Sequence, residues 1–205
     1  RPVNNYVKDR ISASDNGIGT AVGIIGSGDV YISQFYAECN VYADSYVGGF
    51  IGGTSGNVRI ENSYHVGEVV SSVTDFYGAG TVSGVAVGGF VGVNEGDSHI
   101  HLVNSYHMGE VSAKNNNRSV DGIVGVNRSD EVHIDNVFYP SSLYSEFSAN
   151  AADSAMFADG SVAYSLHNYD NGSLTGSIWG QKVGVDPYPV FTSKVEGYKT
   201  DKKVS

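Results

Sequence analysis

Three histidines and one glutamate have the residue types and the spacing of a metal site. They lie in two short segments, HIHL (99–102) and EVHI (131–134), in which these polar residues alternate with aliphatic ones. Alternation is typical of a strand with one buried face, and two such strands stacked in register lie about 4.8 Å apart. Neutral imidazole and carboxylate groups in a tetrahedral set bind zinc. The predicted zinc ligands, on one outward face of the two strands, are His99, His101, Glu131 and His133.

A solvated polar face is the alternative interpretation of this grid of four residues. Tyr31 and Arg59 fall in the column of His101 when the repeats are aligned, so the column accepts different polar residues. A weaker form of the metal hypothesis is a response to pH, because imidazoles this close together resist full protonation below the usual His pKa near 6.5. Apart from zinc at this grid, we expect no cofactor.

The strands that position these residues belong to internal repeats. Residues 47–52 (VGGFIG) recur as residues 87–92 (VGGFVG), and residues 58–69 (VRIENSYHVGEV) recur nearly unchanged as residues 100–111 (IHLVNSYHMGEV). Two weaker copies flank them, and the aligned aromatic residues are 28, 42 and 32 positions apart. A period of tens of residues is typical of solenoid proteins. The aligned aromatic residues are Tyr36, Tyr64, Tyr106 and Phe138.

Stacking of the copies follows from their apolar pattern. No single copy can bury its aliphatic face alone, so we expect each coil to add one strand to each of several sheets. Equivalent positions then form columns along the stack: aliphatic columns in the core, one aromatic column, and an amide ladder of the kind that stacked strands favour. The Gly pairs mark coil corners. The sequence predicts an all-β fold, a right-handed parallel β-helix of about four coils, with an amide ladder of Gln34, Asn62, Asn104 and Asn136.

An insertion interrupts the pattern between the second and third copies. Residues 71–84 add about ten positions, and solenoids display such insertions on one face. Exposed aromatic rings stack on sugars or anchor a protein partner. The candidate binding residues are therefore Asp75, Phe76 and Tyr77.

The repeat stops after Pro140. Residues 148–157 have a helical composition, Gly160 is a stop signal, and residues 161–167 predict a second helical segment. An open solenoid end exposes core and strand edge, so a terminal segment of different character is expected to cover it. The predicted organisation is an N-terminal lead-in (1–19), the repeats (20–140), a C-terminal mixed cap (141–191) and a linker or tail (192–205).

The repeats resemble the GLUG repeat of large bacterial surface proteins. That family typically shows Gly-Gly-Leu-Val-Gly and Asn-Ser-Tyr-Ala-Thr-Gly-x-Val, and the chain has GGFVGVN at 88–94 and NSYHMGEV at 104–111. The resemblance covers roughly residues 20–191, but Phe replaces Leu in two copies and the first copy has no Asn-Ser-Tyr triplet. It implies a surface-exposed β-helical module, found in adhesin-like proteins and in accessory regions of secreted immunoglobulin A peptidases, without catalytic residues.

Composition and charge exclude several classes of partner. The 205 residues include 22 Asp or Glu and 12 Lys or Arg, which gives a formal net charge of −10. Phosphate binding needs a basic patch, so we expect no nucleic-acid partner and no anionic membrane surface. No apolar run approaches the 18 or so residues of a membrane span. The start at Arg1, without an initiator Met, indicates a piece of a larger protein, and the lone Cys39 excludes an internal disulfide.

The commonest signatures of catalysis are missing. No Gly-x-Ser-x-Gly precedes a helical segment, His-Glu-x-x-His is absent, and the Gly-rich strings lack Gly-Lys-Ser/Thr. The expected function is a non-catalytic module at the bacterial cell surface or in a secreted protein. It would act as an adhesin or rigid stalk, and its partners would be a host glycan or protein and the flanking domains of the same chain. Two alternatives stay open: the accessory domain of a secreted metallopeptidase, and a carbohydrate-active β-helix enzyme with two carboxylates ~5 to 9 Å apart across coils.

Overall fold

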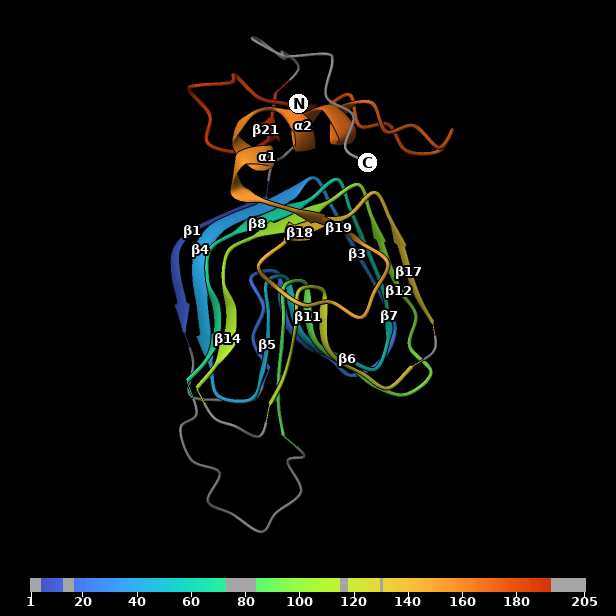
Figure 1. Ribbon diagram of the computed structural model, residues 1–205. Coiled ribbons are helices and arrows are strands. Elements are labelled where there is room, and N and C mark those ends of the chain that lie inside the picture. Colours follow the sequence, from blue (N-terminus) through green and yellow to red (C-terminus); the bar gives the residue numbers. More distant parts are fainter. Residues whose placement is uncertain (1–4, 13–16, 73–83, 115–117, 130, 193–205) are drawn as a thin grey trace.

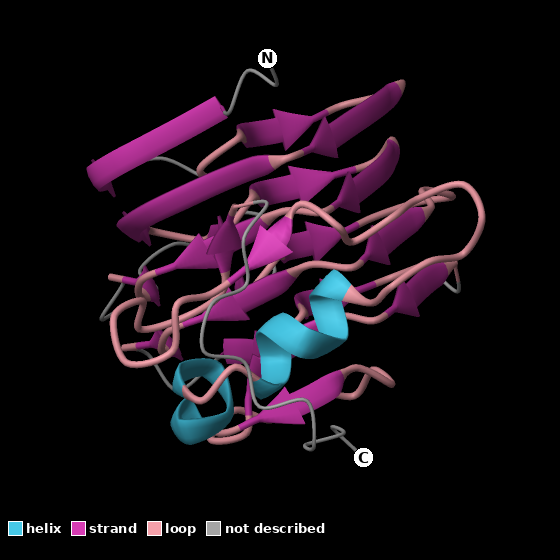
Figure 2. Cartoon of the chain, turned by 90° about the horizontal axis from the view of Figure 1, so that it is seen from above, coloured by secondary structure: helices cyan, strands magenta, loops and turns pink. Residues whose placement is uncertain are grey.

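The protein is a solenoid whose strands wind around one core. The structure is a computed structural model that describes residues 5–12, 17–72, 84–114, 118–129 and 131–192. In this part of the chain, four parallel sheets run along a common axis and surround the core (Figure 1). Strands of successive coils lie one beside the next along that axis (Figure 2). The predicted all-β parallel β-helix is confirmed.

Sheet A is the largest sheet, with eight strands. Its strand β4 is continuous, whereas the next coil divides the same span into β8 and β9, which pair with the two halves of β4. Strand β1, in the predicted lead-in, pairs in parallel with the length of β4 and so extends the sheet by one strand. The strands of sheet A are β1 (Asn5–Ser12), β4 (Phe35–Ala43), β8 (Tyr64–Val66), β9 (Val69–Ser71), β13 (Tyr106–Met108), β14 (Val111–Ala113), β18 (Phe138–Pro140) and β19 (Asn150–Ala152).

The other three parallel sheets take at most one strand from each coil. Their register is the one that the repeats predict, since Val58 pairs with Ile100 and Ile100 pairs with Val132. Sheet B contains β5 (Tyr46–Gly48), β10 (Val85–Gly88) and β15 (Arg118–Asp121); sheet C contains β2 (Val22–Ile25), β6 (Ile51–Thr54), β11 (Val91–Asn94) and β16 (Val124–Asn127); sheet D contains β3 (Asp29–Ser33), β7 (Asn57–Glu61), β12 (Ile100–Val103) and β17 (Val132–Asp135).

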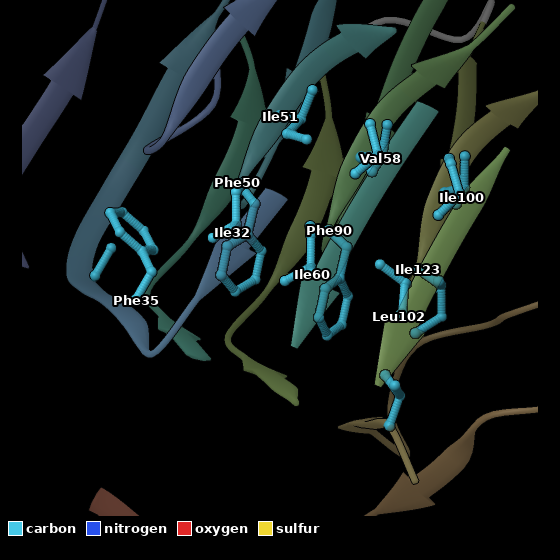
Figure 3. Packing of buried hydrophobic residues seen from close by; sticks show 14 of the residues in the cluster. Ile32, Phe35, Phe50, Ile51, Val58, Ile60, Phe90, Ile100, Leu102 and Ile123 are labelled. Carbon is cyan, nitrogen blue, oxygen red and sulfur yellow. The ribbon is translucent and has the colours of Figure 1, made fainter. Parts of the chain in front are cut away.

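The core consists of columns in which each coil contributes an equivalent side chain. Phe50 and Phe90 occupy the same position in successive coils, and their stacked rings have centroids 5.1 Å apart (Figure 3). Val58 and Ile100 form a neighbouring aliphatic column and are both buried. Burial of one such side chain contributes about 1.5–3 kcal/mol. The solenoid is therefore stabilised by the same contact repeated from coil to coil.

Close packing between coils explains the glycine pairs at the bend from sheet B to sheet C. A Cβ atom on Gly49 would lie 2.1 Å from the carbonyl oxygen of Gly89, and a Cβ on Gly89 would lie 2.1 Å from that of Gly122. No side chain fits at that distance. The predicted corners are confirmed, and their cause is the approach of the next coil.

The predicted amide ladder lies at the corner from sheet D to sheet A. All four residues have left-handed backbone conformations, with φ between 45° and 51°, which Asn tolerates better than most residues. The Nδ2 of Asn104 donates to Oδ1 of Asn62 at 2.6 Å, and the Nδ2 of Asn136 donates to Oδ1 of Asn104 at 2.6 Å. Three consecutive coils are thus joined through their side chains.

The C-terminal cap has two parts. Leu143, Phe147 and Ala149 follow the last repeat strand and pack against the main core cluster, where the chain crosses the end of the coil (Figure 1). The second part consists of α1 (Ser154–Ala158), α2 (Ser161–His167) and the antiparallel pair β20 (Trp179–Gly180) and β21 (Val190–Phe191), and it covers the outer face of sheet A (Figure 1). The predicted cover of the open end is only the smaller part of the cap.

The helical prediction for residues 148–157 was wrong for its first half. Asn150–Ala152 form β19, which pairs with β18 and prolongs sheet A. Helix α1 starts only after Asp153, whose side chain accepts a hydrogen bond from the backbone N–H of Met156. An unpaired edge at the end of a sheet favours one more strand, and that tertiary pairing overrides local helix propensity. Gly160, with φ 88°, separates the two helices as predicted.

The aromatic column lies between sheet A and the second part of the cap, which contains α1, α2, β20 and β21. The rings of Tyr64 and Tyr106 stack with centroids 5.1 Å apart and an interplanar angle of 6°. Trp179 and Phe191 contact this column from the cap, with centroids 5.7 and 5.2 Å from that of Tyr64. The Tyr residues therefore form a second core between sheet and cap. Neither helix in the described ranges is long enough to cross a membrane.

Candidate functional site

The predicted histidine grid lies on the outward face of sheet D. His101 pairs with His133 in the register, and their ring centroids are 5.9 Å apart with an interplanar angle of 67°. The backbone N–H of Ile100 donates to the carbonyl of Glu131 at 2.9 Å, so the two strands run side by side here. The alignment on which the prediction rested is therefore confirmed.

Each imidazole of the grid contacts a different partner. Nδ1 of His101 lies 2.5 Å from Nη1 of Arg59, Nε2 of His133 lies 3.2 Å from a carboxylate oxygen of Glu131, and Nδ1 of His99 lies 2.9 Å from Oδ1 of Asn57. Across the described ranges, no three His, Cys, Asp or Glu side chains are arranged to hold a metal ion. Zinc binding at the grid stays a prediction, and the Arg59 cation beside His101 opposes it.

The contact with Arg59 determines which ring nitrogen of His101 carries the proton. Because a guanidinium only donates, Nδ1 of His101 must be the unprotonated acceptor. Partial burial lowers the pKa of His101, and the positive charge of Arg59 and the neighbouring His133 lower it further. For His101, the lowered pKa has the direction that the predicted resistance to protonation requires.

Glu61 lies in the next column of sheet D and is closed off from solvent. It accepts hydrogen bonds from the Tyr31 hydroxyl and, at 2.8 Å, from Nε of Arg59. Its exposure is 6%, and burial raises its pKa. A carboxylate with both oxygens occupied and little exposed surface holds its neighbours in place, and it is poorly placed to meet a substrate.

The candidate binding residues of the insertion, Asp75, Phe76 and Tyr77, lie outside the described residues. Their role as a binding loop stays a prediction.

A second histidine pair, which the sequence reasoning did not single out, lies inside the coil. His65 and His107 are fully buried, and their rings stack with centroids 5.1 Å apart and an interplanar angle of 7°. The two Nδ1 atoms are 3.0 Å apart, and Nε2 of His65 lies 2.9 Å from the carbonyl oxygen of Cys39. The available signal was the His after Tyr in both close repeats, since alternation turns that His inward when the Tyr faces outward.

The contacts of this pair leave one arrangement of protons for two neutral rings. Nε2 of His65 must donate, because the Cys39 carbonyl only accepts, so Nδ1 of His65 accepts from Nδ1 of His107. Nε2 of His107 then carries a lone pair, and this buried atom makes no hydrogen bond of ordinary geometry in the described part of the chain, although the Gly109 backbone is close enough to oppose the lowering of the pKa of His107. Burial lowers the pKa of His65 to about 4, and burial together with His65 lowers that of His107 well below 6.5.

A groove on the outer face of sheet A is the other feature not predicted. It has a volume of about 960 Å³ and lies between α1, the start of the end-covering segment and the bends after β8 and β13. Its lining includes Val66, Met108 and Phe157 as apolar surface, and Glu68, Glu110 and Asp153 as acids. We refer to it below as the acidic groove. The shared column of Glu68 and Glu110 is visible in the sequence, but the wall that α1 adds is not.

Glycines at the bends shape the floor of the acidic groove. A Cβ on Gly109 would lie 1.9 Å from the carbonyl oxygen of Gly67, and a Cβ on Gly67 would lie 2.2 Å from that of Cys39. Cys39 itself is buried, with 4% exposure. The stacked bends thus leave no room for side chains at Gly67 and Gly109, so backbone and the neighbouring Val66 and Met108 form the floor.

In comparisons with known proteins, no protein-family model, no curated protein and no solved structure matches the chain.

Proposed function

We propose that the chain is a non-catalytic β-helical module of a bacterial cell-surface or secreted protein. It acts as a rigid stalk and offers its sides to a host glycan or protein. The observation that best supports a stalk is the hydrogen bonding of the cap along several coils. The amide ladder donates outward to cap carbonyls: Asn62 to Thr175 at 3.1 Å, Asn104 to Leu166 at 3.1 Å and Asn136 to Ser165 at 3.2 Å.

Cross-linking of coils by the cap has a mechanical consequence. Neighbouring repeats in a solenoid contact only each other, so a bare stack can open one coil at a time. A cap bound to three consecutive coils at once prevents this, because opening one coil also breaks cap contacts of the others. Trp179 adds to the effect, since its Nε1 donates to Oδ1 of Asn62 at 3.1 Å.

Pulling on single molecules through handles at the two ends tests the stalk. We expect one cooperative unfolding event that includes the cap. Asn104→Ala should lower the unfolding force and divide the event, because it removes bonds to two coils and to the cap. Asn168→Ala is the matched control and should behave like the wild type, because it removes an exposed amide that donates only to the Tyr164 carbonyl next to it in the cap, at 2.9 Å, and joins no coils. Gradual extension of the wild-type chain without a force peak would show that it is not a stalk.

A separate experiment tests the adhesive role. The wild-type chain and a Phe76→Ala, Tyr77→Ala variant are applied to an array of host glycans and extracellular proteins. Binding by the wild type that the variant loses would support adhesion through the insertion. If neither protein binds, the adhesive role is contradicted and only the stalk role remains proposed. A His-Glu-x-x-His motif in flanking polypeptide would instead point to the accessory region of a peptidase.

A further inference from the structure

The acidic groove is large enough for part of a polypeptide and carries charge of one sign. At about 960 Å³, it is at the upper end of the range of ~300–1,000 Å³ for ligand pockets. Glu68 and Glu110 come from successive coils, and Asp153 faces them from the start of α1. No Lys, Arg or His lines the groove within the described ranges. A ligand with positive charge would therefore meet three carboxylates and no competing cation.

The carboxylates have capacity left for a ligand. Glu68 accepts one hydrogen bond, from the Tyr42 hydroxyl to Oε2 at 2.7 Å, and Asp153 uses Oδ1 to cap α1 at 2.8 Å. The carboxylate of Glu110 makes no hydrogen bond or ion pair to other described residues, and it is exposed. Carboxylate oxygens accept from Lys or Arg in strong, charge-assisted hydrogen bonds.

The apolar floor selects among cationic ligands. Val66 and Met108 are half-buried and lie between the acidic residues and the aromatic column. Long basic side chains bury an aliphatic stem on such a surface while the charged end stays at the rim. Phe157, the one aromatic side chain in the described lining, is 1% exposed and offers no ring face on which a sugar could stack.

We infer that the acidic groove binds a Lys- or Arg-bearing peptide segment of a partner protein. Basic side chains meet Glu68 and Glu110 at the rim, and their stems lie on Val66 and Met108. The inference rests on the proposed function, since it names the chemistry of a partner for a module that presents its sides to other proteins. The groove should not bind nucleic acid, because the same carboxylates repel its phosphates.

Fluorescence anisotropy with a labelled Arg-Leu-Arg-Leu-Arg peptide tests the inference. The salt concentration is 0.15 M, where the Debye length is about 8 Å and remote charges are screened. We expect saturable binding, and no binding of the Glu-Leu-Glu-Leu-Glu counterpart. Glu110→Gln should weaken the affinity by about tenfold, since a hydrogen bond to a charged group is worth about one such factor. The double variant Glu68→Gln, Glu110→Gln should weaken it further.

Two further variants separate the groove from general electrostatics. Glu131→Gln removes the same charge from exposed sheet D and should change the affinity by less than about twofold. Ser142→Trp puts a bulky ring on the groove wall without a change of charge, and it should abolish binding. Both sites are exposed, so thermal melting should show unchanged folding.

Equal losses in Glu131→Gln and Glu110→Gln would overturn the inference, and so would unsaturable binding or full affinity in Ser142→Trp. The pulling experiment separates these failures from a failure of the proposed function. A chain that unfolds cooperatively under force but binds no basic peptide would still be a stalk without this groove ligand.

Discussion

On sheet A, His65 and His107 lie side by side inside the coil, whereas on sheet D, His101 and His133 lie side by side on the outside. Both pairs arise from the same operation, the stacking of one coil on the next in register. The inner rings are parallel and fully buried, with an interplanar angle of 7°, and the outer rings are tilted at 67°. Because side chains alternate between faces with period two, a shift of one residue decides which environment a histidine meets.

The imidazoles of the two pairs differ in their contacts and in their protonation. In the outer pair, His101 contacts Arg59 and both rings reach solvent. The inner pair bonds to itself and to the Cys39 carbonyl, so it stays neutral and depends on its protons being in one arrangement. The difference teaches that the histidines whose pKa is lowered furthest lie in the core, while the histidines with the spacing of a metal site lie on a polar surface.

The largest expected effect is acid destabilisation by the inner pair. In the unfolded chain each His takes up a proton near pH 6.5, whereas in the folded chain the pKa of His65 is about 4 and that of His107 is also lowered. Stability is therefore complete above pH 6.5 and falls as the pH drops towards 4. His65 alone accounts for about 3 kcal/mol. Urea unfolding between pH 7.5 and 4.5 measures this loss.

Two double variants assign that pH dependence. His65→Phe, His107→Phe should have a much flatter profile, since it removes both inner imidazoles. His101→Gln, His133→Gln should keep most of the wild-type slope, because the pKa of His101 is lowered as well but its ring is only partly buried. If the outer variant flattened the profile instead, the assignment to the inner pair would be wrong.

The next effect is an asymmetry within the inner pair. His65→Phe should destabilise the fold by about 0.5–1.5 kcal/mol more than His107→Phe, because it also removes the hydrogen bond from Nε2 of His65 to the Cys39 carbonyl. His107→Phe removes a buried Nε2 atom that makes no hydrogen bond of ordinary geometry to the described residues. Chemical unfolding at pH 7.5 measures the difference, and equal losses would contradict the assigned proton arrangement.

A smaller effect is expected at the outer pair when Arg59 is replaced. Arg59→Met should raise the pKa of His101 towards its ordinary value, because the neighbouring positive charge is one of the causes that lower it. The free energy of unfolding should fall by about 1 kcal/mol through loss of the bond to Glu61. Proton NMR titration of the imidazoles measures the pKa. A pKa of His101 that stays unchanged would leave burial and the neighbouring His133 as the causes of its lowering.

The smallest effect is that of zinc on the wild-type chain. With Nδ1 of His101 held by Arg59, we expect saturating zinc or nickel to change the melting temperature by less than about 2 °C. Arg59→Met should respond more strongly, because it frees that nitrogen. A large shift in the wild type, lost in His133→Gln, would show that the four-residue site predicted from the sequence does assemble.

Much of the fold could be predicted from particular residues. The alignment of Tyr64 with Tyr106 and of His101 with His133 was correct, because identical side chains in consecutive coils stack only in that register. The β19 strand was not predicted, since Asn150–Ala152 match no repeat and pair only because β18 offers an open edge. The acidic groove was missed for a similar reason: α1, which forms one of its walls, is far in sequence from Glu68 and Glu110.

The sequence by itself determined the solenoid, its coil number, its columns and its corners, because each is a local pattern repeated at fixed positions. Only the tertiary structure decided which faces are covered. The cap segment lies along sheet A, where the tyrosine column and the amide ladder receive it, and leaves the histidine column of sheet D partly exposed. That choice depends on contacts between repeated and non-repeated residues more than 60 positions apart, such as Asn104 with Leu166. No periodicity along the chain records such contacts.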